Sequence, residues 1–203
     1  ENRERAHAPG KTGREVYVKV QHTVRNVLGK DVFINGCAMH EVGLGFGIFD
    51  GSRTGSDDRA TWPGMQVYFR SMFGANYLHN ICWFCDPDTV MVRPPLTVDE
   101  ARTIVSTIAL CGQTYMASDF MDKLPRERVE LYRKTIPVME IVPVDLYPYK
   151  PVEEDQKGIV WSCPNVTSFP RAMDLKINRE SGVYDVVGLF NWEDKPAEVS
   201  GSL

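Results

Sequence analysis

Hydrophobic positions follow two different periods along the first two thirds of this chain. Valines recur at helical spacing from Val16 to Val27 and are followed by Gly29, which predicts an N-terminal helix. Short apolar runs that end in turn residues predict strands at residues 31–36, 47–53, 79–84 and 114–118. Longer amphipathic stretches predict helices at residues 62–77, 98–112 and 126–136.

The order of these elements predicts the fold class. Strands and helices alternate with short turns, and a Thr97–Glu100 capping box marks the start of one helix. This alternation is typical of a parallel α/β sheet or a (β/α)8 barrel. We therefore expect residues 1–150 to form an α/β unit.

The pattern changes after Pro148. A polar, proline-containing stretch resembles a linker, and short runs at residues 158–163, 172–178 and 184–192 predict antiparallel strands. These runs are too few for a β-sandwich, which has about seven strands. We therefore expect residues 151–203 to form part of an antiparallel β domain.

Composition excludes several classes of partner. The chain has 203 residues, 43% of them hydrophobic, and a net charge of -4, so neither a nucleic acid nor an anionic membrane is an expected partner. No apolar run approaches the roughly 20 residues that span a bilayer. Five cysteines do not form an even disulfide framework, and the Cys82–Cys85 pair lacks the second pair that a zinc site needs. We therefore expect no zinc site, and the absence of a P-loop or GxGxxG motif predicts no phosphate or dinucleotide cofactor.

Each predicted strand is followed by side chains that could carry chemistry. In a (β/α)8 barrel, the carboxyl ends of the strands face one opening, where substrates bind. The candidate residues are Cys37, Arg53, Asp57, Asp86, Asp88, Ser118 and Asp119.

Each candidate also has an ordinary structural explanation. Arg53 and Asp57 could form a surface ion pair, worth at most about 1 kcal/mol. The Asp86–Asp88 stretch could be a turn in which a carboxylate accepts backbone N–H groups. Asp119 could cap the following helix, and Trp83 could pack in the core instead of contacting a sugar ring. Spacing alone does not decide between these alternatives.

Two stretches together resemble the melibiase-type α-galactosidases. Residues 31–57 are similar to a strand-loop-strand segment that ends in Asp-x-Met-Arg-x-Gly-x-Asp. Residues 85–120 are similar to Asn-Asp-Pro-Asp, then Leu-Thr-x-x-Glu-Ala, then a strand ending in Leu-Ser-Asp-Asp. Residues 123–137 and 184–192 resemble the last barrel helix and a strand of the C-terminal β domain. The resemblance covers about residues 17–195.

The resemblance implies a retaining glycosidase that most closely fits α-galactosides. Asp57 matches the general acid/base, and Arg53 and Cys37 match residues that contact the sugar. Asp86 and Asp88 match acids that orient these groups. In retaining enzymes the nucleophile and the acid/base lie roughly 5–5.5 Å apart, and the nearby charge helps the acid stay protonated.

The nucleophile is missing from this chain. The family carries it in a Lys-x-Asp motif upstream of the matched segment, and no such motif precedes residue 31. The resemblance therefore implies the second half of a (β/α)8 barrel followed by part of a β domain. We expect the other half barrel as a partner, from the same or another polypeptide, and expect this chain alone to be inactive.

Four departures from the family pattern leave the sugar open. They are Ala38, the His40–Glu41 pair, Cys85 and Phe120. The alternatives are a glycosidase or transglycosidase for another sugar, or a non-catalytic carbohydrate-binding or structural subunit.

Overall fold

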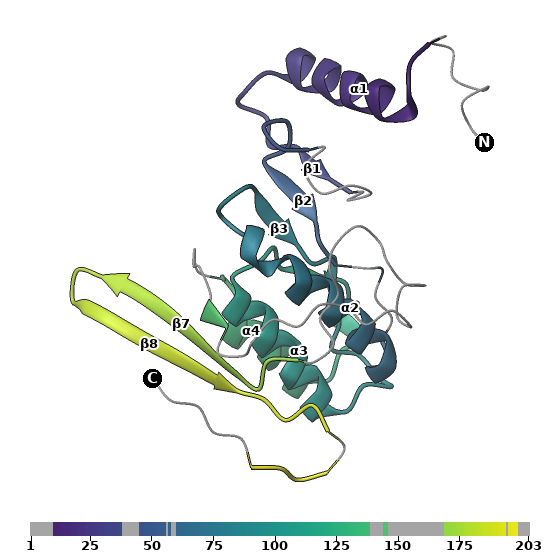
Figure 1. Ribbon diagram of the computed structural model, residues 1–203. Helices are drawn as coiled ribbons and strands as arrows, with labels where there is room; N and C mark the ends of the chain where they lie inside the picture. The colour runs from purple at the N-terminus through teal and green to yellow at the C-terminus, as the bar shows by residue number, and fades with distance from the viewer. Residues whose placement is uncertain are drawn as a thin grey trace.

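The computed structural model describes residues 10–37, 45–55, 57, 60–138, 144–145, 169–193 and 195–198 (Figure 1). Its α/β part comprises α1 (Gly13–Leu28), β1 (Asn35–Gly36), β2 (Gly51–Arg53), α2 (Trp62–Ala75), β3 (Phe84–Asp86), β4 (Thr89–Val90), α3 (Val98–Cys111), β5 (Met116–Ala117) and α4 (Arg126–Thr135). Two 3-10 helices, η2 (Asn76–Leu78) and η3 (Met121–Lys123), lie between them. The antiparallel part comprises β6 (Val144–Asp145), β7 (Ala172–Arg179) and β8 (Gly182–Leu189).

The described strands of the α/β part are parallel and follow one another in chain order. β1, β2 and β3 form one sheet, in which Arg53 pairs with Asp86, and β4 and β5 form a second. Only Pro87 and Asp88 separate β3 from β4. The carboxyl ends of β1, β2 and β3 therefore lie along one edge. The half barrel expected from the sequence stays a prediction.

One predicted strand was misplaced. Residues 79–84 were expected to be extended, but the strand is Phe84–Asp86 and a 3-10 helix and turn precede it. The N–H groups of Ile81 and Cys82 donate to the carbonyl of Leu78, which keeps this stretch out of the sheet. Isoleucine, tryptophan and phenylalanine favour strands, but local turn bonds decide the conformation here.

The predicted helices are confirmed within a few residues, because their ends carry local signals. The Thr97–Glu100 capping box is formed in full, and the Thr61 hydroxyl accepts the N–H of Gly64 at the start of α2. α3 ends at Gly112, whose φ of +61° is in the left-handed region that glycine adopts readily.

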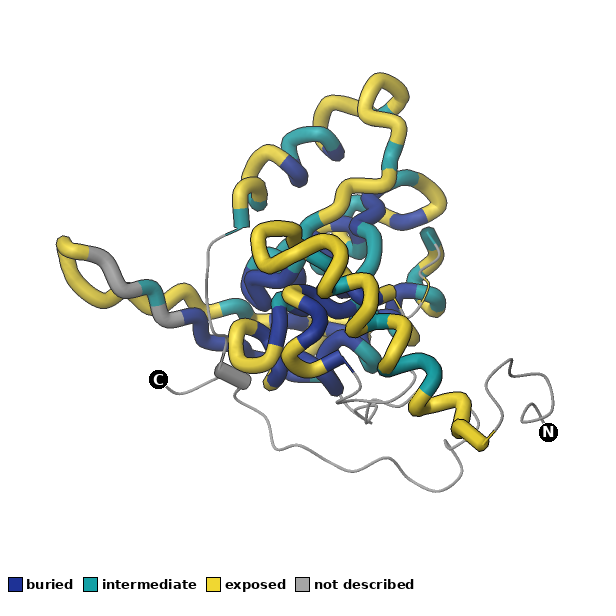
Figure 2. Tube along the Cα trace, turned by 90° about the horizontal axis from the view of Figure 1, so that it is seen from above, coloured by how far each residue is buried: buried dark blue, intermediate teal, exposed yellow. Residues whose placement is uncertain are grey.

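The main core lies between α2, α3, α4 and the base of the β7–β8 hairpin (Figure 2). α2 contributes Met65, Tyr68, Phe69 and Met72, each with no exposed surface. Burial of a large apolar side chain stabilises a fold by about 1.5–3 kcal/mol, so this face of α2 contributes strongly. Trp192 stacks against Trp62 and packs edge-to-face against Phe69.

The antiparallel sheet has the order β6-β7-β8, and its hairpin projects from the body (Figure 1). β6 precedes residue 150 and still pairs with β7, through Val144 and Asp174. This sheet therefore takes one strand from before the predicted linker. The strand predicted at residues 158–163 lies outside the described residues. Within the described part, no helix is long and apolar enough to cross a membrane.

Candidate functional site

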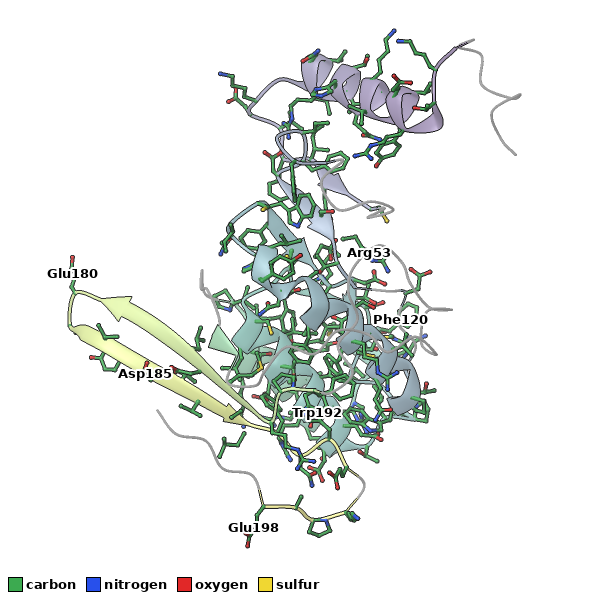
Figure 3. The ribbon with its side chains drawn as sticks, viewed as in Figure 1. Arg53, Phe120, Glu180, Asp185, Trp192 and Glu198 are labelled. Atoms are coloured by element: carbon green, nitrogen blue, oxygen red, sulfur yellow. The ribbon has the colours of Figure 1, made fainter. Side chains whose placement is uncertain are left out.

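Arg53 is at the centre of the candidate site (Figure 3). It ends β2 and lies beside Asp86, which ends β3. Its Nη2 donates to Asp57 Oδ1 at 2.7 Å and to a carboxylate oxygen of Asp88. Its Nη1 donates to Cys37 Sγ, 3.6 Å away, just beyond β1. The structure thus brings five predicted site residues together at the strand ends.

Asp86 holds this cluster from within the sheet. It is 3% exposed, and its Oδ2 accepts a hydrogen bond of 2.5 Å from Asn35 Nδ2. Its Oδ1 accepts the backbone N–H of Asp88 at 2.9 Å, which is the turn considered as an alternative from the sequence. Asp88 has a φ of +86°, an uncommon value for a residue with a side chain. The turn and the ion pair with Arg53 together hold Asp88 in this conformation.

The loops after β2 and β3 pack against each other without space for a side chain. A Cβ added at Gly55 would lie 1.9 Å from the carbonyl oxygen of Pro87. The backbone N–H of Thr54 donates to the carbonyl of Asp86 at 2.7 Å, and its hydroxyl lies 3.5 Å from Gln113 Oε1 in the interior. The relative position of Arg53 and the second loop is therefore set by backbone packing.

The charges around Arg53 favour its ionised form. Burial alone would lower its pKa, but the hydrogen bond with Cys37 and the charges of Asp88 and Asp57 together raise the pKa above its usual value. The two acids differ in exposure, because the Asp88 side chain is 17% exposed and that of Asp57 is 96% exposed. Asp88 is therefore the fixed counter-ion, and Asp57 is the acid that a ligand can reach.

A second cluster follows β5 and includes two residues that the sequence reasoning missed. The Asp119 side chain has no exposed surface, and its Oδ1 accepts from Arg93 Nη1 at 2.7 Å. Its Oδ2 accepts the N–H of Val92 at 2.6 Å and the hydroxyl of Tyr132 at 2.8 Å. Burial and this hydrogen bond raise the pKa of Tyr132. Ser118 contributes backbone groups only, including a carbonyl 3.4 Å from Arg93.

A usable signal for Arg93 was present in the sequence. It follows the apolar run 89–92, just as the other candidates follow strands. Because the third strand was expected to end at Asp86–Asp88, residues 89–92 were not predicted to be extended, and Arg93 was not a candidate.

Trp83, expected as a possible sugar contact, is not part of either cluster. It precedes β3, whose far end carries Asp86, and it is 5% exposed. Its ring lies 4.7 Å from that of Phe46, and it belongs to a small core with Cys85. Cys85 is fully buried and faces the carbonyl of Ala75, so this departure from the family pattern does not line the site.

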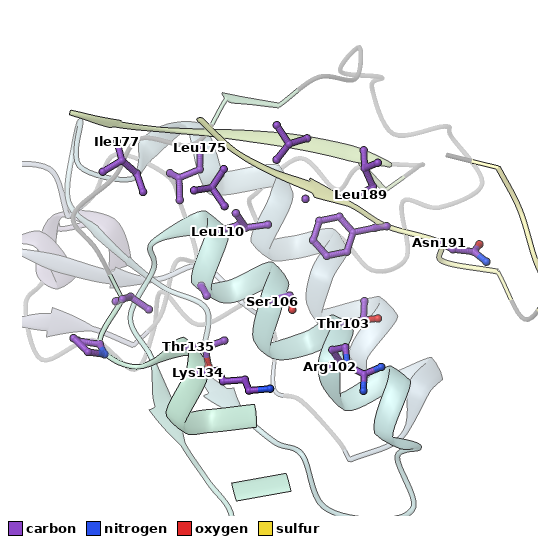
Figure 4. Close-up of a pocket in the computed structure, with 17 residues that line it drawn as sticks. Arg102, Thr103, Ser106, Leu110, Lys134, Thr135, Leu175, Ile177, Leu189 and Asn191 are labelled. Atoms are coloured by element: carbon purple, nitrogen blue, oxygen red, sulfur yellow. The ribbon is translucent and has the colours of Figure 1, made fainter. Parts of the chain in front are cut away.

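A separate hollow of about 550 Å³ lies between α3, the end of α4 and the β7–β8 hairpin (Figure 4). Arg102 and Lys134 lie at this hollow, and Leu110 and Leu175 are among its apolar lining residues. No carboxylate is among the described residues that line it. The candidate groups for acid/base chemistry therefore lie at Arg53, outside this hollow.

No model of a known protein family and no curated protein matches this chain. Among the described residues, no group of three or more His, Cys, Asp or Glu side chains could hold a metal ion. The Arg53 cluster is therefore the feature of the described residues that bears most directly on function.

Proposed function

We propose that this chain carries the acid/base side of the active site of a retaining α-glycosidase, acting on terminal α-galactosides. The supporting observation is the position of Arg53 between an exposed acid, Asp57, and a largely buried one, Asp88. The three residues lie where parallel strands end, which is where α/β folds bind substrates.

In the first step, Asp57 donates a proton to the glycosidic oxygen while a carboxylate from outside this chain attacks the anomeric carbon. The bond to the leaving group breaks, and a covalent glycosyl-enzyme forms. In the second step, the Asp57 carboxylate takes a proton from water as the water attacks the same carbon, which releases the sugar. Arg53 donates hydrogen bonds to a sugar hydroxyl, and Asp88 keeps its guanidinium oriented.

The proposal includes a second half barrel as partner. α1 has no buried residue, and its stripe of Val20, Val24 and Val27 is 51%, 38% and 79% exposed. α1 is attached largely by Arg25, whose Nε donates to the carbonyl of Ile48 at 2.8 Å. Parallel sheets are normally covered on both faces, and open sheet edges attract further strands. Additional βα units, from the same or another polypeptide, would cover these surfaces and supply the nucleophile.

A non-catalytic sugar-binding subunit is the second candidate. It is favoured by the fact that Asp86 and Asp88 are both engaged by hydrogen-bond donors. This leaves Asp57 as the exposed carboxylate of the described cluster. Such a subunit would bind the sugar through Arg53 without turnover.

Cysteine alkylation tests sugar binding with an internal control. Cys37 and Cys82 are both exposed, whereas Cys85 and Cys111 are buried. We expect saturating methyl α-galactoside to slow the alkylation of Cys37 by iodoacetamide, followed by peptide mass spectrometry, and to leave Cys82 unchanged. Equal labelling rates of Cys37 with and without the sugar would overturn the proposal.

A turnover assay then separates the two candidates. A glycosidase should hydrolyse aryl α-galactosides when the complementary half barrel is added, and the chain alone should not. Protection of Cys37 without turnover in the complemented protein would support the binding subunit instead.

A further inference from the structure

The turn after β5 directs an aromatic ring toward solvent. Phe120 is 73% exposed and follows Asp119, whose own side chain is fully buried. The Lys123 ammonium lies 4.7 Å from the centroid of the Phe120 ring. An exposed cation–π contact of this kind is weak, so a ligand ring can replace the ammonium or use the opposite face.

Arg93 places hydrogen-bond donors next to this ring. Its Nη1 bonds to Asp119 and approaches the carbonyl of Ser118, the two residues before Phe120. Its side chain is 41% exposed, and its Nε and Nη2 make no hydrogen bond with other residues that the structure describes. Asp119, which is held by three donors, therefore fixes the guanidinium and leaves donors available to a ligand.

Phe120 lies on the same side of the molecule as Arg53 in Figure 3, where both residues are labelled. Arg93 is five residues beyond Asp88, so their Cα atoms are separated by at most about 18 Å. β2, β3, β4 and β5 also run in the same direction within their sheets. In α/β barrels, the loops after neighbouring strands build one binding site.

We propose that Phe120 and Arg93 form a second sugar subsite, which binds the leaving-group ring of the substrate; this inference depends on the glycosidase or sugar-binding function proposed above. A pyranose ring has an apolar C–H face and a rim of hydroxyl groups. The Phe120 ring can stack on the apolar face, and Arg93 can donate hydrogen bonds to the hydroxyl groups. Asp122 is exposed in the same turn and offsets the charge of Lys123, so the subsite suits a neutral sugar.

The experiment compares methyl α-galactoside with melibiose, which carries a glucose ring in place of the methyl group. Affinity is measured by calorimetry and by protection of Cys37 in the full chain. We expect melibiose to bind roughly five- to tenfold more tightly, the value of one aromatic stacking contact. Phe120→Ala should remove this difference and leave the affinity for methyl α-galactoside unchanged, and Arg93→Gln should reduce it.

Phe33→Ala is the matched control. Phe33 is 63% exposed and lies against Gly51 at the opposite end of β2 from Arg53. This variant should keep the preference for melibiose. If the wild type shows no preference, or if Phe120→Ala retains it, the subsite is refuted while binding of the methyl glycoside still supports the proposed function. If neither sugar binds, both proposals fail.

Discussion

The close packing of Gly55 against Pro87 gives the sharpest prediction, because the overlap that a side chain would create is known. In Gly55→Ala, the new Cβ would lie 1.9 Å from the Pro87 oxygen, and an ordinary contact begins at 3.4 Å. The two loops must therefore separate by about 1.5 Å, since the atoms that the new Cβ would meet belong to the Pro87 backbone and cannot rotate away. That movement would break the 2.7 Å hydrogen bond from Thr54 to Asp86 and pull Arg53 away from Asp88.

The expected cost follows from these contacts. Overpacking costs about 1–3 kcal/mol, and a lost backbone hydrogen bond adds about 1 kcal/mol. With a slope of about 1–3 kcal/mol per molar urea, the unfolding midpoint should fall by roughly 1 M. Sugar affinity should also fall, by up to about a hundredfold, because a displacement of about 1 Å in an active site can reduce activity by that factor.

Urea unfolding by circular dichroism and alkylation of Cys37 with methyl α-galactoside provide the two measurements. Gly13→Ala, at the first residue of α1, is the control, since nothing lies within 4 Å of the added Cβ. It should leave both quantities nearly unchanged. An unchanged urea midpoint together with unchanged protection of Cys37 in Gly55→Ala would refute the described contact between the two loops.

The buried imidazole of His79 has its pKa lowered to about 4 by burial, against 6.5 in the unfolded chain, so the unfolded state binds more protons between these values. The free energy of unfolding should therefore have its full value above pH 6.5 and fall by about 3 kcal/mol towards pH 4. The urea midpoint of His79→Gln should not show this dependence on pH. In the complemented enzyme, Asp57→Ala should reduce turnover of natural galactosides far more than that of activated aryl galactosides in the glycosylation step, because good leaving groups need less protonation; equal losses would argue against Asp57 as the acid. Asp119→Asn should lower the free energy of unfolding by roughly 1–3 kcal/mol, whereas Tyr132→Phe should lower it by about 1 kcal/mol; if the Asp119 variant unfolds like wild type, its three hydrogen bonds do not stabilise the fold.

Local signals made the helices predictable, and the absence of such signals explains the misplaced strand. The Thr97–Glu100 capping box is a contact within one turn, so the sequence displays it directly. The parallel strands are only two or three residues long, and neighbouring elements determine where they begin and end. Residues 79–84 look extended in composition, but hydrogen bonds to Leu78 fold them into a turn.

The sequence predicted which residues belong to the candidate site, but not which of them contact one another. Strand ends identified Arg53, Asp57 and Asp88, whereas the pairing of Arg53 with Asp88 joins residues 35 positions apart. That pairing depends on the conformation of Asp88 and on the packing of the two loops, which no local pattern reveals. Trp83 is a different case. Contacts with residues far away in the sequence, such as Phe46, decide whether its ring packs in a core or stays open to a sugar, and no local pattern displays those contacts.

The choice of residue at position 88 supports a functional origin for this cluster. Glycine adopts a φ of +86° without strain, whereas a side chain in such a conformation costs about 1–2 kcal/mol. Stability alone would therefore favour glycine unless the carboxylate were needed. The need visible in the structure is the counter-charge for Arg53, since Asp57 is too exposed to orient the guanidinium by itself. A guanidinium oriented in this way beside a reachable acid can serve the sugar binding that the proposed function requires. Strain at this strand edge is consistent with a binding site built at the expense of the fold.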